Sequence, residues 1–186
     1  WDGVMNYSGF TEPTLHWLSG FTLDALRCDA ELTSEKPITT ETLARTWKDN
    51  LAAIPWSVAL QQFNLLGSHD TSRLGSVLKG DDDLIRMAVM IQFTFPGVPC
   101  VYYGDEIGLE NEDGFGQRNC FPWDQRNWDI DLFNFYQKLI ALRKESQVLA
   151  RGSFQTLYWD EDLIIYQRLL AGERIVLTAN RGEKRE

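Results

Sequence analysis

The chain has 186 residues, of which 44% are hydrophobic and 24% are charged, proportions that are ordinary for a folded domain. Its 18 basic and 27 acidic side chains give a net charge of -9. This balance argues against partners such as nucleic acids or anionic membrane surfaces, because both need an excess of lysine and arginine. No apolar run approaches the roughly 18 residues of a membrane span.

The three cysteines, Cys28, Cys100 and Cys120, form no C-x-x-C pair. We therefore expect neither a zinc site nor a disulfide framework, and a reducing compartment, the cytoplasm, is the expected localisation.

The first part of the chain alternates short strands with helices. Residues 4–7 predict a short strand that ends in polar residues. Thr40 is expected to cap a helix whose apolar residues recur every four positions and which ends near Pro55. Residues 63–66 predict a second strand, although the flanking residues 58–60 could equally be helical.

A buried helix and an amphipathic helix follow. Residues 81–83 are acidic and begin a helix that is apolar nearly all round, which ends at Pro-Gly in residues 96–97. Residues 98–103 predict a third strand, and residues 104–127 a long loop rich in Gly, Asn and Asp. Asp129 then begins an amphipathic helix.

The last part of the chain has a different pattern. Three strand-like runs are separated by acidic or glycine-containing turns, which predicts an antiparallel sheet: residues 154–159, 163–169 and 175–179. The alternation of strand and helix in the first part of the chain, by contrast, predicts parallel βα units. We therefore divide the chain into residues 1–151, an α/β unit, and residues 152–186, an antiparallel unit.

Polar side chains follow two of the predicted parallel strands, where functional groups collect in α/β proteins. His69 and Asp70 follow one strand, and Asp105 and Glu106 follow the next. A histidine beside a carboxylate can bind neighbouring hydroxyls of a polar ligand, and the carboxylate can stabilise positive charge developing there. The alternative is structural: Asp70 caps the following helix and His69 packs at the rim.

Other chemistries fit less well. Ser68, His69 and Asp70 are the residue types of a nucleophilic triad, but consecutive residues on an extended segment point to opposite faces. There is no Walker loop, HExxH or paired-histidine spacing, and the other histidine, His16, is expected to be structural. We expect no metal site and no cofactor.

Four segments together resemble the α-amylase family, glycoside hydrolase family 13. Residues 63–73, FNLLGSHDTSR, are similar to its fourth conserved region, and residues 95–108, FPGVPCVYYGDEIG, to its eighth-strand motif. Residues 2–7, DGVMNY, resemble its sixth-strand segment, and residues 118–124, RNCFPWD, the loop between its last strand and last helix. The FNLLGSHD wording is typical of the neopullulanase, cyclomaltodextrinase, maltogenic amylase and maltodextrin glucosidase subgroup.

The resemblance implies the C-terminal part of a (β/α)8 TIM barrel, strands 6–8, followed by the start of an antiparallel β-sandwich domain. Such a barrel takes ~250 residues, so we expect a fragment of a larger enzyme. The implied parent is a retaining hydrolase of α-1,4-glucosidic bonds in maltodextrins or cyclodextrins. Retention needs a nucleophile and an acid/base. In this family these are an Asp on strand four and a Glu on strand five, both before Trp1. The fragment alone is therefore expected to be inactive.

The resemblance also implies roles for individual residues. Asp70 corresponds to the third carboxylate, which stabilises the transition state, and His69 to a neighbour that hydrogen-bonds the same sugar. Arg118 corresponds to a residue that holds the next glucose of the α-glucan oligosaccharide together with an acid. Asp113 is the candidate acid, although the family's usual Asn-Asp-Pro is replaced here by DGFG. The eighth-strand residues Tyr102, Asp105 and Glu106 could be structural.

Two other functions remain open at this point. One is a non-catalytic sugar-binding homologue, and the other is an α-glucan transferase or isomerase on the same scaffold. Three barrel strands alone also leave open sheet edges and an uncovered face. We therefore expect self-association, or pairing with the missing barrel half.

Overall fold

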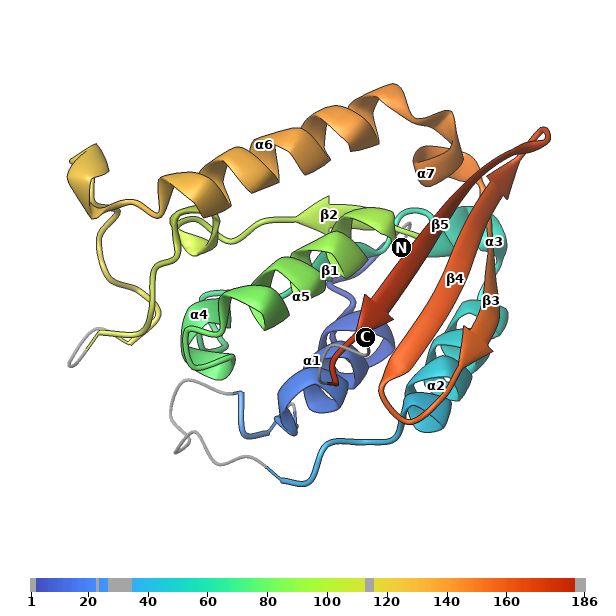
Figure 1. Ribbon diagram of the computed structural model, residues 1–186, viewed down its shortest axis with the longest axis horizontal. Helices are drawn as coiled ribbons and strands as arrows, with labels where there is room; N and C mark the ends of the chain where they lie inside the picture. Colours follow the sequence, from blue (N-terminus) through green and yellow to red (C-terminus); the bar gives the residue numbers. More distant parts are fainter. Residues whose placement is uncertain (1–2, 23, 27–34, 113–115, 183–186) are drawn as a thin grey trace.

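Two short parallel strands lie between the helices of the α/β part (Figure 1). The structure is a computed structural model that describes residues 3–22, 24–26, 35–112 and 116–182. Strands β1 (Phe63–Leu65) and β2 (Val98–Cys100) pair in parallel. A single parallel bridge joins Met5 to Phe63. The prediction of parallel βα units is therefore confirmed.

The strand predicted over residues 4–7 is wrong except for the bridge at Met5. The chain turns at once into a π-helix, η1 (Tyr7–Thr11), because the backbone N–H groups of Phe10 and Thr11 both bond to the carbonyl of Asn6. Helix α1 (Glu12–Ser19) continues from it, with a proline in its first turn, where the missing N–H has no intrahelical partner to lose.

Helix α2 (Thr40–Ala52) forms as predicted, but Thr40 is not its cap. The cap is Thr39, whose hydroxyl oxygen accepts a hydrogen bond from a first-turn backbone N–H at 3.1 Å. Thr40 is fully buried: its hydroxyl accepts from Trp17 Nε1 at 2.9 Å and donates to the carbonyl of Glu161 at 2.7 Å. Packing against two distant segments therefore decides the role of Thr40.

The remaining helices of the α/β part follow the sequence pattern closely. Residues 58–60 fall largely within α3 (Trp56–Ala59), so the helical alternative for this flank is correct. After the short α4 (Leu74–Val77), α5 (Asp82–Thr94) begins behind Asp81, whose carboxylate accepts from a first-turn N–H at 3.0 Å. Helix α5 is largely buried, as expected.

The predicted loop 104–127 contains two 3-10 turns, η2 (Asp105–Ile107) and η3 (Gln125–Asn127). Helix α6 (Ile130–Glu145) begins behind Asp129 as predicted, and the short α7 (Gln147–Arg151) follows it. In Figure 1, α6 runs along one side of the molecule.

The end of the chain is a three-stranded antiparallel sheet, as predicted, which we call the tail sheet. Its strands are β3 (Ser153–Trp159), β4 (Leu163–Leu170) and β5 (Glu173–Asn180), with β4 in the middle. In Figure 1 it lies at one end of the molecule, and the loop with η3 lies at the other.

Aromatic rings join the tail sheet to the α/β part. The rings of Trp47 and Phe95 are 5.0 Å apart, and those of Phe95 and Phe154 are 5.2 Å apart. Tyr166 packs on Phe154, and its hydroxyl shares a hydrogen bond with Thr94 Oγ1 at 2.6 Å. Both parts of the chain therefore contribute to one hydrophobic core.

Two arginines hold the C-terminal end of α5. Arg168, on β4, is fully buried and donates to the carbonyls of Thr94 (2.9 Å) and Gly152 (2.8 Å). Arg143, on α6, donates to the carbonyl of Phe93 at 2.8 Å. Burial lowers the pKa of each arginine to about 10, so both stay charged at neutral pH and suit the negative end of the helix dipole.

Candidate functional site

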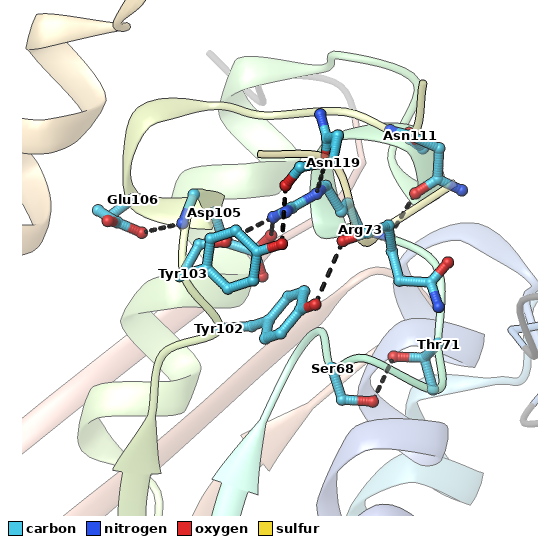
Figure 2. A network of polar contacts seen from close by, with 12 residues as sticks. Ser68, Thr71, Arg73, Tyr102, Tyr103, Asp105, Glu106, Asn111 and Asn119 are labelled. Carbon is cyan, nitrogen blue, oxygen red and sulfur yellow. Dashed lines mark hydrogen bonds and ion pairs between the residues drawn. The ribbon is translucent and has the colours of Figure 1, made fainter. Parts of the chain in front are cut away.

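The loop after β1, residues 67–73, is folded around the hydroxyl of Ser68. Ser68 Oγ accepts from Tyr7 Oη at 2.9 Å and from the backbone N–H of Asp70 at 3.1 Å, and it shares a hydrogen bond with Thr71 Oγ1 at 3.1 Å (Figure 2). These bonds use Ser68 to shape the loop, which fits the argument against a nucleophilic triad. We call residues 67–73 the site loop.

His69 and Asp70 lie side by side at the surface of the site loop. His69 Nε2 is 3.2 Å from Asp70 Oδ2, and the two side chains are 61% and 62% exposed. The next helix, α4, begins behind Arg73 and has no side-chain cap. The structural alternative, with His69 packed and Asp70 as the helix cap, therefore does not match these contacts.

Arg118 reaches the same place from the loop beyond β2. Its Nη2 lies 3.4 Å from Asp70 Oδ1, and its Nε donates to the carbonyl of His69 at 2.9 Å. The side chain of Gln117 donates to the same carbonyl. The structure thus brings three of the four predicted site residues together. The fourth, Asp113, lies outside the described residues.

The cluster presents three kinds of polar group to solvent: a carboxylate, an imidazole and a guanidinium. Together they can accept and donate hydrogen bonds over a short span, which suits a ligand that carries adjacent hydroxyls. The Asp70 carboxylate can also stabilise a positive charge that develops on such a ligand.

Behind the site loop, Arg73 is fully buried and is the centre of a polar network (Figure 2). Its Nε donates to Asn119 Oδ1 at 3.0 Å, and its Nη1 donates to the carbonyl of Tyr103 at 2.6 Å. The carboxylate of Asp105 lies 3.5 Å from Nη1. The backbone N–H of Arg73 donates to Asn111 Oδ1 at 2.9 Å. The network ties the end of the site loop to the loop after β2.

Asp105 occupies a structural position in this network. Its exposed fraction is 4%, and burial raises its pKa to about 7, in spite of the opposing effect of Arg73. A Cβ atom at Gly67 would lie 2.6 Å from Asp105 Oδ2, so only glycine leaves room for this carboxylate. Glu106 accepts from the backbone N–H of Gly104 at 2.7 Å. Both acids therefore serve the local fold.

Two adjacent tyrosines complete the network. The guanidinium of Arg73 lies 4.9 Å from the ring centroid of Tyr102 and 4.8 Å from that of Tyr103. Tyr102 Oη donates to the carbonyl of Gln117 at 3.2 Å, and Tyr103 Oη donates to that of Asn119 at 2.7 Å (Figure 2). Sequence reasoning found the tyrosines only as part of a motif and missed Gln117 and Asn119 as their partners, because no local pattern marks such contacts.

Two further features lie apart from this site. A cleft of about 730 Å³ lies between α2 and β3, and its lining includes Trp56 and Trp159 but none of the site residues. Within the part of the chain that the structure describes, no three His, Cys, Asp or Glu residues gather as metal ligands, and no helix could cross a membrane. Cys100 and Cys120 are exposed free thiols.

Comparisons with known proteins identify a family and several relatives. Residues 11–128 match the family described as alpha amylase, catalytic domain. The chain is 38% identical over 130 residues to a cyclomaltodextrinase of Thermoanaerobacter pseudethanolicus, covering 70% of this chain and 23% of the relative. It is 31% identical over 182 residues to an intracellular maltogenic amylase of Bacillus subtilis, covering 96% and 28%. A debranching enzyme from Nostoc punctiforme superposes with a TM-score of 0.84 at 33% identity, covering 98% of this chain and 38% of that chain.

The chain thus spans less than a third of the length of these two curated relatives. The names of these two relatives, cyclomaltodextrinase and maltogenic amylase, belong to the group of which the FNLLGSHD segment is typical. The structural neighbours indicate a fragment of a TIM-barrel enzyme.

Proposed function

The chain belongs to the α-amylase family, and on this premise we propose that it is part of a retaining hydrolase of α-1,4-glucosidic bonds in maltodextrins and cyclodextrins. The observation that carries the proposal is the convergence of Asp70, His69 and Arg118 from two separate loops. The names of the relatives, cyclomaltodextrinase and maltogenic amylase, support the substrate class.

In the proposed mechanism, Asp70 binds hydroxyls of the sugar at the cleavage point and stabilises the oxocarbenium-like transition state. His69 hydrogen-bonds the same sugar, and Arg118 positions the chain of glucose units. Retention needs two more carboxyl groups about 5–5.5 Å apart, one as nucleophile and one as acid/base. We propose that these come from strands four and five, outside this chain, so that the chain alone is inactive.

We further propose that the segment at Met5, β1 and β2 are strands 6, 7 and 8 of the barrel, and that the tail sheet begins a β-sandwich domain at residue 152. The parallel order of the three segments supports this assignment. So do the exposed apolar side chains on them: Val4 is 55%, Phe63 46% and Val98 41% exposed. Parallel strands are normally covered on both faces.

The same exposed side chains support pairing with the missing half of the barrel or, in its absence, self-association. We also place the protein in the cytoplasm. The absence of a cysteine pattern typical of disulfides and the name of the intracellular relative from Bacillus subtilis support this placement.

The proposal is tested by measuring maltotriose hydrolysis with two proteins, the full-length enzyme that contains this chain and the 186-residue chain. We expect turnover from the first alone, with retained anomeric configuration in the product. Failure of the full-length enzyme to act on maltotriose would refute the proposed activity. Turnover by the 186-residue chain would refute the assignment of the two other carboxylates to strands outside it. Predominant transfer or isomer products would indicate a transferase or isomerase on this scaffold.

A further inference from the structure

We propose that Tyr102 and Tyr103 are positioning residues that hold Arg118 at the substrate site through the backbone on either side of it. Residues 116–119 are called the arm. The inference rests on the proposed roles of Asp70 and Arg118, and it concerns residues that touch neither the sugar nor the reacting atoms.

The two tyrosine hydroxyls bind the arm at the residues immediately before and after Arg118. Tyr102 Oη donates to the carbonyl of Gln117 at 3.2 Å, and Tyr103 Oη donates to the carbonyl of Asn119 at 2.7 Å. Because the peptide groups of both neighbouring residues are held by these bonds, the backbone of Arg118 has little conformational freedom.

Burial alternates along the arm from one residue to the next. Gln117 is 3% and Asn119 is 8% exposed, whereas the side chain of Arg118 is 60% exposed. Gln117 and Asn119 are thus buried, while Arg118 between them extends to the surface, where it contacts the His69 carbonyl and the Asp70 carboxylate.

The two tyrosines that bind the arm are themselves held in place by Arg73. Arg73 is fully buried, lies against both tyrosine rings and donates to Asn119 Oδ1 at 3.0 Å (Figure 2). Burial, together with the contact with Tyr103, raises the pKa of Tyr102 to about 12. The Tyr102 hydroxyl therefore keeps its proton, and remains a donor, throughout the neutral pH range.

Loss of a tyrosine hydrogen bond to the arm should affect substrate binding more than the rate of the chemical step. Arg118 contacts Asp70 at the surface, where its correct placement must be fixed before the ligand arrives. A freer arm requires Arg118 to be ordered on binding, which raises KM. The reacting groups keep their own positions, so kcat changes little.

The test uses Tyr102→Phe and Tyr103→Phe in the full-length enzyme, with maltotriose as substrate. Each change deletes one hydroxyl and keeps the ring against Arg73. We expect each to raise KM roughly three- to tenfold, as the loss of one hydrogen bond predicts, with kcat within about twofold. Tyr158→Phe is the matched control, because Tyr158 is half-exposed on the tail sheet, and it should leave both constants unchanged.

A double-mutant cycle separates positioning from simple destabilisation. In an Arg118→Ala background, Tyr103→Phe should no longer raise KM, because the residue through which it acts is gone. Additive effects in the cycle, an unchanged KM, or a fall in kcat alone would each overturn the inference.

A second measurement does not depend on activity. In the 186-residue chain, Tyr103→Phe should speed hydrogen exchange at the arm amides, whereas Tyr158→Phe should not. Unchanged hydrogen exchange at the arm amides in Tyr103→Phe would overturn the proposed positioning role. A wild-type enzyme inactive on maltotriose would instead refute the proposed function, and hydrogen exchange would still decide whether the tyrosines hold the arm.

Discussion

Arg118 Nη2 lies 3.4 Å from Asp70 Oδ1, although 48 residues separate the two in the chain. Both side chains are about 60% exposed, and surface ion pairs of this kind contribute little to stability. Stability of the fold alone therefore does not account for this pair, and the proposed function assigns it to ligand binding. In the proposed function Arg118 holds the glucose next to the one that Asp70 binds, and the structure brings the two side chains into direct contact.

The first prediction concerns Asp70. In the full-length enzyme, Asp70→Asn should lower kcat on maltotriose by several orders of magnitude, because the amide cannot stabilise the positive charge of the transition state. The circular dichroism spectrum and the melting temperature should not change, since Asp70 is a surface residue. Asp49→Asn, a change at another exposed carboxylate, serves as the control. Unaltered turnover in Asp70→Asn would end the assignment of this residue.

The second prediction is a pH dependence that arises from Asp105. Burial raises its pKa to about 7 in the folded chain, above the unfolded value of about 4. Between these values only the unfolded state releases the proton. The contribution of Asp105 to the free energy of unfolding is therefore full below about pH 4 and is lost as the pH rises to about 7.

Urea denaturation of the wild type and of Asp105→Asn across this window measures the effect. The free energy of unfolding of the wild type relative to the variant should fall as the pH rises, by up to about 1.4 kcal/mol per pH unit. A difference that stays constant or grows with pH would show that Asp105 titrates in its ordinary range.

The third prediction tests the close approach at Gly67. Gly67→Ala places a Cβ 2.6 Å from Asp105 Oδ2, so the buried carboxylate must move and the variant should lose about 1–3 kcal/mol. Gly75→Ala is the comparison, because the added Cβ there lies 3.0 Å from the side chain of Glu110, which can shift, and 3.3 Å from the carbonyl of Leu109, so its crowding is milder. Equal losses in chemical denaturation would contradict the proposed crowding at Gly67.

The fourth prediction separates the roles of Thr39 and Thr40. Thr39→Ala removes the helix cap and should cost about 1 kcal/mol of unfolding free energy. Thr40→Val deletes a buried hydroxyl and leaves Trp17 Nε1 and the Glu161 carbonyl without this partner, so its cost should be larger, about 2–4 kcal/mol. The reverse ranking would contradict the roles assigned to the two threonines.

The fifth prediction concerns association. The apolar residues at the Met5 bridge and on β1 and β2 are each more than 40% exposed: Val4, Met5, Phe63 and Val98. Apolar side chains on parallel strands are normally covered. The 186-residue chain should therefore form oligomers in light scattering, and Phe63→Lys should shift the distribution toward monomer. A monodisperse wild-type monomer would contradict this expectation.

Local patterns predicted most of the fold. Asp81 and Asp129 begin their helices because a carboxylate before an apolar run satisfies free backbone N–H groups, which is a short-range interaction. The turns between its strand-like runs predicted the tail sheet equally well. The N-terminal strand was wrong because a π-helix that bonds to the Asn6 carbonyl takes its place, which the alternation of residue types does not indicate. The cap at Thr40 was wrong because its hydroxyl bonds to Trp17 and Glu161, which are distant in the sequence.

The candidate site likewise contains residues that local sequence patterns predict and contacts that they do not. His69 and Asp70 are adjacent in sequence, and a strand end marks them. Arg118 was found only through resemblance, and its contact with Asp70 depends on how one loop folds over another. The Tyr103 and Asn119 contact joins positions 16 residues apart across an irregular loop, and nothing local encodes it.

The contact of Arg168 with the end of α5 has a consequence for the order in which the chain matures. Thr94 precedes Arg168 by 74 residues, and a ribosome adds about 5–20 residues per second. For several seconds after α5 emerges, the carbonyl that Arg168 will bind therefore faces solvent. The C-terminal end of α5 therefore gains this contact only after β4 has been synthesised, which makes it one of the late contacts of the folding chain.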